Sequence, residues 1–268
     1  MIHPVHALDS FFYSSMGVYE FHSQCEMLAE LGYDGITVSA WGGTPYTDLA
    51  LLPMVKEQHG LEIAGLYLVL HEGRNDTVLR RIIETVEGVE LIELAVQTTL
   101  NGMGAIKSFI QSILPIAERR GLRIALYPHL RHVTQTTSQV IELCEDFNHP
   151  RLGASFNGYH WFASEEGQLE QRLDAIKPWL MQVVLSGSAM SPLGWGGVAT
   201  MEPPDRGELD NSAIIAALNR LGYGGSIGLL GWDYGGDIYR KLERSIKAIH
   251  EIDDRLAKHP AWARSLIG

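Results

Sequence analysis

The sequence predicts a single α/β barrel in which eight parallel strands alternate with helices, a (β/α)8 architecture. Apolar, β-branched runs alternate with amphipathic segments along the whole chain, and a glycine marks the junction at four places. The length of 268 residues is close to the roughly 250 that such a barrel uses as one domain. An open, doubly wound sheet would show the same alternation, but eight repeats within this length favour a closed barrel.

The four marked junctions each place a glycine between a helical pattern and an apolar run. The glycines are Gly32, Gly60, Gly121 and Gly222, and the runs that follow span residues 35–39, 62–70, 123–127 and 226–230. Glycine readily adopts the left-handed conformation that caps the end of a helix. Each junction therefore predicts a helix, a cap and a buried strand.

Four further strands are expected at places where no glycine marks the junction between helix and strand as clearly. They are Val5–Leu8, Val89–Val96, Arg151–Phe156 and Leu180–Leu185. No linker or shift in composition divides the chain, so we assign residues 1–258 to one barrel and residues 259–268 to a C-terminal tail.

The longest irregular stretch is expected at residues 187–207, directly after the seventh strand, where glycine and proline are frequent. Loops longer than about 15 residues in a compact domain are usually functional or disordered. Because barrels of this class keep their sites at the carboxyl ends of the strands, we interpret this loop as a lid or substrate loop. A mobile surface insertion is the alternative.

The composition disfavours several classes of partner. The chain has 21 Lys and Arg against 32 Asp and Glu, a net charge of −11 that is unsuited to a nucleic-acid surface. No apolar run approaches the roughly 20 residues of a membrane helix, and the N-terminus lacks a signal pattern. We therefore expect a cytoplasmic protein without nucleic-acid or membrane partners. Nothing in the composition argues against a homo-oligomer. Cys25 and Cys144 lack a redox or zinc spacing and are expected to be reduced, buried thiols.

Several short phrases, taken together and in order, resemble the xylose-isomerase-like TIM barrel superfamily of sugar isomerases and epimerases. They are the phrase Ala-Leu-Tyr-Pro-His at 125–129, the stretch from His149 to His160, the segment 206–210 and the segment 222–231. The phrases extend across essentially the whole chain. The resemblance implies a carbohydrate ligand at the mouth of the barrel: a sugar, a keto-sugar or a sugar phosphate.

In catalytic members of that superfamily, a Glu, an Asp, a His and a second Glu from the last four strands bind a divalent metal ion. The matching positions here hold Tyr127, Asn157, Val184 and Leu230, and no small change of register restores the set. Valine and leucine offer no lone pair, and one neutral amide is a poor ligand for such an ion. We therefore expect no manganese, magnesium or zinc and no other cofactor. The family's two glutamates also transfer protons, so its usual isomerisation is expected to be lost.

The residues expected at the strand ends are rich in aromatic and imidazole groups. As catalytic candidates we select His129, His160, His71 and Glu72, because histidine titrates near neutral pH. As substrate contacts we select Trp41, Gln97, Tyr127, Asn157, Trp161, Ser186, Trp195, Arg206, Trp232 and Asp233. Tryptophan rings cover the C–H faces of a sugar while polar groups bond to its hydroxyls. For each tryptophan and histidine, a purely structural role in the rim of the barrel is the alternative.

Two functions remain open from these residues. The first is a carbohydrate-directed isomerase, epimerase or lyase that works without the usual metal, with His129 and His160 as acid and base. The second is a non-catalytic sugar-binding or regulatory protein. A third possibility, a metal-dependent DNA-repair endonuclease, is disfavoured by the acidic charge and the missing metal ligands.

Overall fold

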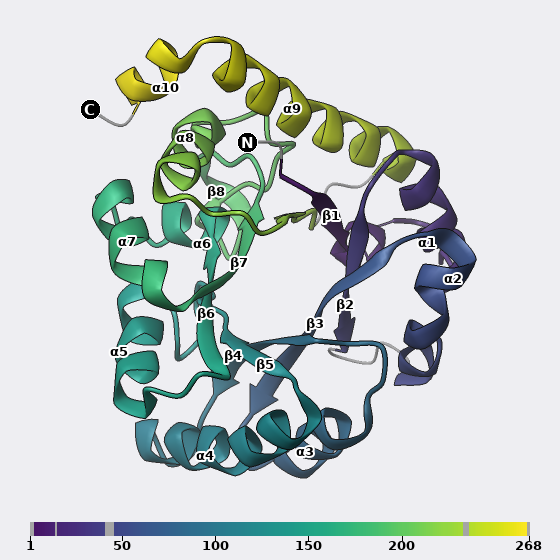
Figure 1. Ribbon diagram of the computed structural model, residues 1–268, viewed down its shortest axis with the longest axis vertical. Coiled ribbons are helices and arrows are strands. Elements are labelled where there is room, and N and C mark those ends of the chain that lie inside the picture. The colour runs from purple at the N-terminus through teal and green to yellow at the C-terminus, as the bar shows by residue number, and fades with distance from the viewer. Residues whose placement is uncertain (1–2, 14, 41–45, 233–235, 267–268) are drawn as a thin grey trace.

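Eight parallel strands close into a barrel in the order β1-β2-β3-β4-β5-β6-β7-β9, in a computed structural model that describes residues 3–13, 15–40, 46–232 and 236–266. Figure 1 shows the strands as an inner ring with the helices outside it. The barrel strands are β1 (Val5–Leu8), β2 (Gly35–Ala40), β3 (Glu62–His71), β4 (Leu91–Thr98), β5 (Arg123–Leu126), β6 (Leu152–Asn157), β7 (Leu180–Leu185) and β9 (Ile227–Leu229). The predicted (β/α)8 barrel is confirmed.

The helices cover the outer surface of the strand ring (Figure 1). They are α1 (Phe21–Glu30), α2 (Val55–His59), α3 (Asp76–Thr85), α4 (Met103–Arg120), α5 (Thr137–Phe147), α6 (Gly158–Ala163), α7 (Leu169–Ile176), α8 (Asn211–Leu221), α9 (Ile238–Lys258) and α10 (Pro260–Leu266), with short 3-10 turns η1 (Asp9–Phe12), η2 (Tyr46–Ala50), η3 (Leu52–Met54) and η4 (Lys177–Trp179). The segment expected as a tail after residue 258 therefore contains a helix, α10, which packs against α8 and α9.

The glycine junctions fold as the sequence indicates. Gly60, Gly121 and Gly222 are the C-caps of α2, α4 and α8, each with a φ between 72° and 74°. Gly32, after α1, has a φ of 81°. Because L-residues with a Cβ rarely adopt this region, glycine at these positions lets each helix end abruptly and the next strand begin.

The segment 187–207 is more regular than its sequence suggests. It contains strand β8 (Met190–Trp195), and Met190 and Trp195 both form antiparallel bridges to Ala199. The Tyr159 hydroxyl donates to the carbonyl oxygen of Ala199 at 3.0 Å, which ties this hairpin to α6. The expectation of an irregular loop is therefore wrong for residues 190–195. This segment lies outside the barrel sheet, and its backbone pairs within the hairpin instead.

The inner face of the barrel has a polar layer below its mouth. The side chain of Glu93 is fully buried there and accepts a hydrogen bond from Ser155 Oγ at 2.7 Å, while burial raises its pKa to about 7. In the same layer, His6 Nε2 lies 2.9 Å from Gln182 Nε2. Several strand side chains that point into the barrel are therefore polar, whereas those on the outer face of the strands are apolar.

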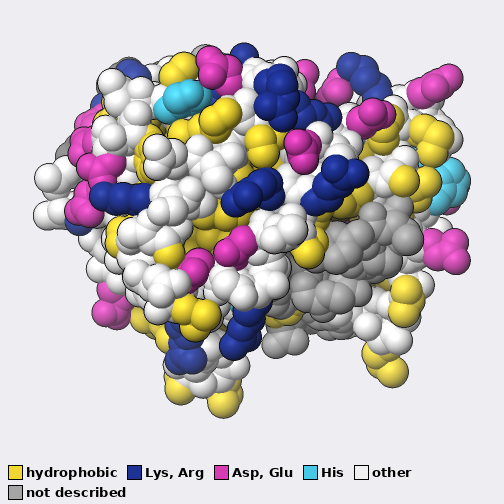
Figure 2. Space-filling view, turned by 90° about the horizontal axis from the view of Figure 1, so that it is seen from below, with side chains coloured by type: hydrophobic (Ala, Val, Ile, Leu, Met, Phe, Trp, Pro, Cys, Tyr) yellow, Lys and Arg dark blue, Asp and Glu magenta, His cyan; other side chains and the backbone are white. Residues whose placement is uncertain are grey.

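Cys25 and Cys144 are both buried and free, as predicted. Within the described ranges, no helix is both long enough and apolar enough to cross a membrane. On the face shown in Figure 2, Lys and Arg side chains are interspersed with Asp and Glu and do not gather into one basic patch.

Close packing between β6 and η4 gives a test of the fold. A Cβ on Gly153 would lie 2.4 Å from the Trp179 carbonyl oxygen and 2.7 Å from Met181 Cε. We expect Gly153→Ala to lower the free energy of unfolding by about 1–3 kcal/mol, as overpacking does. Gly104→Ala is the matched control, because a Cβ on this exposed residue would meet nothing within 4 Å. Urea unfolding that shows both variants equally stable would contradict this packing.

Candidate active site

A cavity of about 110 Å³ lies at the carboxyl ends of the barrel strands. A buried water needs about 10–15 Å³ of such volume, so the cavity has room for several water molecules or for one small ligand. Its lining residues are Leu8, Ser10, Tyr13, Ser39, Tyr67, Gln97, Tyr127, His129, His132, His160, Trp195, Met201, Leu230 and Trp232.

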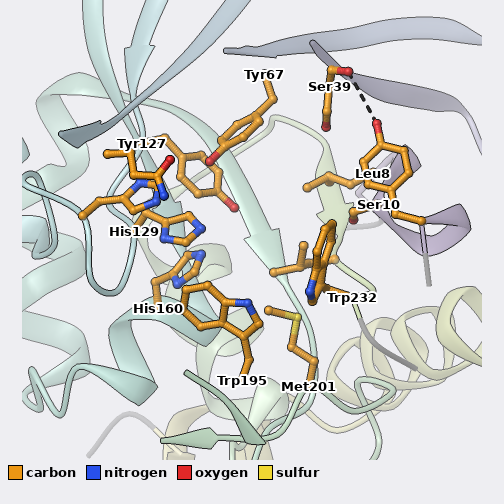
Figure 3. A pocket seen from close by; sticks show the side chains of 14 residues that line it. Leu8, Ser10, Ser39, Tyr67, Tyr127, His129, His160, Trp195, Met201 and Trp232 are labelled. Atoms are coloured by element: carbon orange, nitrogen blue, oxygen red, sulfur yellow. Dashed lines mark hydrogen bonds between the residues drawn. The ribbon is translucent and has the colours of Figure 1, made fainter. Parts of the chain in front are cut away.

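The described walls of the cavity are largely aromatic and carry no charged side chain. Figure 3 shows Trp195 beside the histidines and Trp232 on the other side of the cavity, with the rings of Tyr67 and Tyr127 near each other. The two tyrosine rings meet edge to face, with centroids 5.0 Å apart and an interplanar angle of 74°. Among the described lining residues there is no Lys, Arg, Asp or Glu. A charged ligand group would therefore find no counter-ion among these described residues.

Three imidazole rings pack together on one side of the cavity. The rings of His129 and His132 stack with centroids 3.7 Å apart and an interplanar angle of 12°. The ring of His160 lies 4.0 Å from that of His129, and the edge of Trp195 meets His129 at 5.3 Å. Figure 3 shows His129 and His160 adjacent to each other above Trp195. The cluster removes all three imidazoles from most of the solvent.

Burial keeps these histidines neutral near pH 7. It lowers the pKa of His129 to about 4 and that of His132 to about 3, and it holds the pKa of His160 well below the ordinary value. Repulsion from the neighbouring imidazoles lowers the pKa of His132 and His160 further. Each ring therefore has one N–H and one nitrogen lone pair, and their positions determine what the ring can do.

The backbone of Leu130 sets complementary tautomers on His129 and His160. The Leu130 N–H donates to His160 Nδ1 at 3.2 Å, so the proton of neutral His160 must lie on Nε2. His129 Nδ1 donates to the Leu130 carbonyl oxygen at 2.8 Å, because a carbonyl can only accept. His129 therefore keeps a lone pair on Nε2. One ring can accept a proton, and the other can donate a hydrogen bond.

Asn157 holds His160 in place. As the N-cap of α6, its Oδ1 accepts a hydrogen bond from the backbone N–H of His160 at 3.0 Å. Its Nδ2 donates to the hydroxyl of Tyr127, which follows β5. The side chain of Asn157 thus links the ends of β5 and β6, and both of its polar atoms are used within the protein.

The four positions at which the family resemblance places metal ligands do not fit a divalent cation. Tyr127, Val184 and Leu230 pack in one buried apolar cluster. Burial raises the pKa of Tyr127 well above its ordinary range, so its phenol stays protonated. The oxygen of Asn157 already caps α6. Elsewhere in the described ranges, no three or more His, Cys, Asp and Glu side chains are arranged to hold a metal ion.

The structure brings together six of the residues selected from the sequence. His129, His160, Gln97, Tyr127, Trp195 and Trp232 line the cavity. Asn157 lies directly behind Tyr127 and is buried. Trp41 and Asp233 lie outside the described residues.

The other two catalytic candidates, His71 and Glu72, are not among the lining residues. His71 ends β3, and its backbone N–H donates to Asn75 Oδ1 at 2.8 Å. The Glu72 carboxylate accepts hydrogen bonds from Leu100 N at 2.6 Å, from Thr99 Oγ1 at 2.9 Å and from Asn101, and these bonds lower its pKa. Glu72 therefore braces the loop after β4.

Three of the proposed substrate contacts also lie outside the lining. Trp161 points toward the core around Phe156 and donates from Nε1 to the Gly167 carbonyl oxygen at 3.1 Å. Ser186 is fully buried, and its carbonyl oxygen accepts a hydrogen bond from Asn211. Arg206 is exposed in the turn before α8. Trp161 lies in α6 and Ser186 directly follows β7, whereas Arg206 precedes α8, so the three residues do not converge on the cavity.

Several lining residues were not selected from the sequence. Ser10 and Tyr13 directly follow β1, and Ser39 and Tyr67 lie within β2 and β3. A signal was available: Thr37 and Ser39, like Gly65 and Tyr67, are two residues apart, which is the spacing of one face of a strand. Polar or small residues at that spacing in otherwise apolar strands indicate the inside of the barrel.

Comparisons with known proteins agree with this architecture. The family model described as xylose isomerase-like TIM barrel matches residues 25–252. No curated protein matches the chain. Among solved structures, a D-allulose 3-epimerase from Methylomonas sp., in complex with D-allulose, is 16% identical over 92% of this chain and 96% of its own, with a TM-score of 0.73.

Two further solved structures contain metal ions. The IOLI protein with a bound zinc atom is 16% identical, with 93% of this chain and 97% of its own covered and a TM-score of 0.76. A xylose isomerase-like TIM barrel protein from Mycobacterium smegmatis, in complex with magnesium, is 15% identical, with 93% and 96% covered and a TM-score of 0.68. At these identities the likeness establishes the fold.

The buried histidines predict a pH-dependent stability. The pKa of folded His132 is about 3 against 6.5 for an exposed histidine, so its contribution is complete above about pH 6.5 and is lost as the pH falls toward 3. Asp9 and Glu93, whose pKa values are raised, act in the opposite direction. As the pH falls from 6.5 to 4.5, we therefore expect the free energy of unfolding to decrease less for His132→Gln than for the wild type. The slopes of the two free energies against pH should differ by at most about 1.4 kcal/mol per pH unit.

Urea unfolding at several pH values measures this difference. His22→Gln is the control, because the His22 side chain is 61% exposed. Parallel pH profiles for the wild type and His132→Gln would contradict the burial of this imidazole.

Proposed function

The chain belongs to the xylose isomerase-like TIM barrel family, and we propose that it binds a neutral, hydroxylated carbonyl compound, an unphosphorylated ketose or a close relative, and moves a proton within it without a metal ion. The observation that carries this proposal is the pair of neutral histidines with complementary tautomers in a cavity whose described lining has no charged side chain.

The charge of the walls supports a neutral ligand. A sugar phosphate needs Lys, Arg or a helix N-terminus to hold its phosphate group, and the described lining has no cationic side chain. Trp195 and Trp232 offer apolar faces to C–H groups, whereas Ser10, Ser39 and Gln97 offer polar partners for hydroxyls. Among the alternatives of sugar, keto-sugar and sugar phosphate, these walls favour the first two.

The proposed reaction is a proton transfer at the carbon beside a carbonyl. His160 Nε2–H donates a hydrogen bond to the carbonyl oxygen, and His129 Nε2 accepts the proton from the neighbouring carbon. The electron pair of the broken C–H bond forms a C=C bond while the carbonyl π pair moves to the oxygen, which gives an enediolate whose charge the His160 Nε2–H stabilises. The His129 imidazolium then returns the proton to the same carbon or, once a proton has passed from the neighbouring hydroxyl to the charged oxygen, to the adjacent carbon. A neutral imidazole is able to polarise a carbonyl in this way.

The residues at the ligand positions support the proposal that no metal ion is needed. The resemblance assigns metal binding and proton transfer to positions that here hold Tyr127, Asn157, Val184 and Leu230. Tyr127 and Leu230 line the cavity without a charge, and Asn157 is engaged with α6. We therefore propose that hydrogen bonding by His160 replaces the role of the ion.

A second candidate function is non-catalytic sugar binding. The observation that favours it is the low pKa of His129, about 4, because the same burial opposes the imidazolium that forms when His129 takes up a proton. Binding without turnover would leave the aromatic walls as the functional feature. The two candidates differ in one measurable property, the exchange of a substrate C–H proton.

Thermal unfolding with added ligands tests the choice of ligand. After treatment with EDTA, we expect D-allulose and D-fructose to raise the Tm and D-fructose 6-phosphate to leave it unchanged, since ligands that bind the native state stabilise it. Added Mn²⁺, Mg²⁺ or Zn²⁺ should change neither the Tm nor the ketose response. Stabilisation by micromolar metal ion, or by the phosphate ester alone, would overturn the proposal.

Proton exchange in D₂O, followed by NMR, tests the chemistry. The wild type should exchange the C–H proton beside the carbonyl of a stabilising ketose. His129→Gln should lower that rate by about 10²–10⁴-fold, the usual contribution of a positioned base. His22→Gln should exchange at the wild-type rate, because His22 lies on the exposed face of α1. Binding with no exchange by the wild type would exclude the catalytic role and leave the non-catalytic candidate.

A further inference from the structure

We infer that the phenol proton of Tyr127 points into the cavity and donates a hydrogen bond to the ligand, and that Asn157 is the positioning residue that directs it there. The role toward a ligand rests on the proposed function, because it requires an acceptor such as a carbonyl oxygen in the cavity. The direction of the proton follows from the protein alone.

The orientation of the Asn157 amide is fixed by the helix that it caps. Asn157 is the N-cap of α6, and the backbone N–H of His160 lies 3.0 Å from one of the two terminal atoms of its side chain. A backbone N–H can only donate, so that atom must be the amide oxygen Oδ1. The other terminal atom, which contacts the Tyr127 hydroxyl, is therefore the amide nitrogen Nδ2.

This nitrogen determines how the Tyr127 hydroxyl is used. An amide nitrogen has protons to donate and does not accept, so the Tyr127 oxygen is the acceptor of the bond with Asn157. Burial raises the pKa of Tyr127 well above its ordinary range, and its phenol therefore keeps its proton at neutral pH. That proton must be directed away from Asn157.

The described side chains next to Tyr127 do not take up this proton. In the part of the chain that the structure describes, Asn157 is the one hydrogen-bond partner of the Tyr127 hydroxyl. The negative charge of Glu93 is near enough to raise the pKa of Tyr127. The Oε1 of Glu93 nevertheless accepts from Ser155, and its Oε2 has no hydrogen-bond partner among the described residues.

The remaining direction for the proton is the cavity. Tyr127 lines the cavity, whereas Asn157 is buried behind it and is not among the lining residues. Figure 3 shows the Tyr127 ring extending from the wall, with its hydroxyl oxygen toward the open space. A ligand that places an acceptor there receives the hydrogen bond.

The same amide holds two donors on one side of the cavity. Its oxygen binds the backbone of His160, whose Nε2–H is fixed by Leu130, and its nitrogen binds the Tyr127 hydroxyl. The rings of Tyr127 and His160 meet edge to face, with centroids 5.8 Å apart and an interplanar angle of 76°. A carbonyl oxygen has two lone pairs and can accept from both donors. Donors held ready for the oxygen on which charge develops stabilise an enediolate.

This arrangement gives new chemistry to two positions of the chain. The family resemblance places metal-binding carboxylates at residues 127 and 157, where oxygen lone pairs would face a cation. Here Asn157 donates to Tyr127, and Tyr127 donates onward. The pair therefore serves an electron-rich oxygen of the ligand directly.

Proton exchange and affinity, both measured with D-allulose at pH 7.5, test the donor. Tyr127→Phe removes the hydroxyl and keeps the ring. The rate of C–H exchange at saturating D-allulose should fall by about 10²–10³-fold, the usual loss for one such donor, whereas the Kd should rise by less than about tenfold. Tyr239→Phe is the matched control and should exchange at the wild-type rate, because the Tyr239 hydroxyl binds Glu30 on the exposed surface. An unchanged exchange rate in Tyr127→Phe would overturn the inference.

Asn157→Asp tests the direction of the proton. One carboxylate oxygen can still accept from the His160 N–H, while the other accepts the phenol proton and turns it away from the cavity. The exchange rate should fall about as far as in Tyr127→Phe, and the double variant should be little slower than Tyr127→Phe. If the added charge acted on the imidazoles instead, the double variant would be slower by the same factor again, and the inference would be overturned.

A ligand-free measurement distinguishes this inference from the proposed function. Neutron diffraction of the wild type at pH 7.5 should show the Tyr127 Oη deuteron directed into the cavity and two deuterons on the Asn157 atom that faces it. A deuteron directed from Tyr127 at Asn157 or at Glu93 would overturn the inference. If D-allulose and D-fructose fail to bind the wild type, the proposed function fails, and the neutron map still decides the direction of the proton.

Discussion

Closure of the barrel at β1 is the constraint on which the cavity depends. β1 pairs in parallel with both β2 and β9, so Val5 to Leu8 lie between the first and the last parts of the sheet. This pairing brings the turn after β1, with Asp9 and Tyr13, within reach of Ser39 on β2 and of Trp232 after β9. The histidine side of the cavity comes from the ends of β5 and β6. A cavity with two different walls exists only because the ring is closed.

The fold could be predicted from the sequence because it depends on repeated local signals. The glycine caps at Gly60, Gly121 and Gly222 mark helix ends that need no knowledge of the partner strand. The barrel strands were placed within two residues of their observed bounds for the same reason. The hairpin at β8 escaped prediction, because its pairing with Ala199 involves glycine-rich and proline-rich sequence that also suits an irregular loop.

The candidate site could be predicted only in part. His129, Gln97 and Trp232 follow or end strands, and strand position was enough to place them in the cavity. The role of Leu130 could not be predicted, because it depends on backbone atoms that every residue type except proline has in the same form. These atoms determine the tautomers of two histidines. The role of Glu72 was wrongly predicted for a similar reason: its four hydrogen bonds come from three residues of the loop after β4, and only the tertiary structure brings that loop to it.

Trp195 reaches the cavity from the hairpin that contains β8, not from a strand of the closed ring. The hairpin contacts the rest of the molecule through interactions such as the hydrogen bond from the Tyr159 hydroxyl to the Ala199 carbonyl oxygen. It does not pair with the barrel strands, because β7 pairs directly with β9. An insertion or deletion there would resize the upper wall and leave the eight-strand ring intact. Within this architecture, ligand preference can therefore diverge through a change in one connecting segment, at little risk to folding.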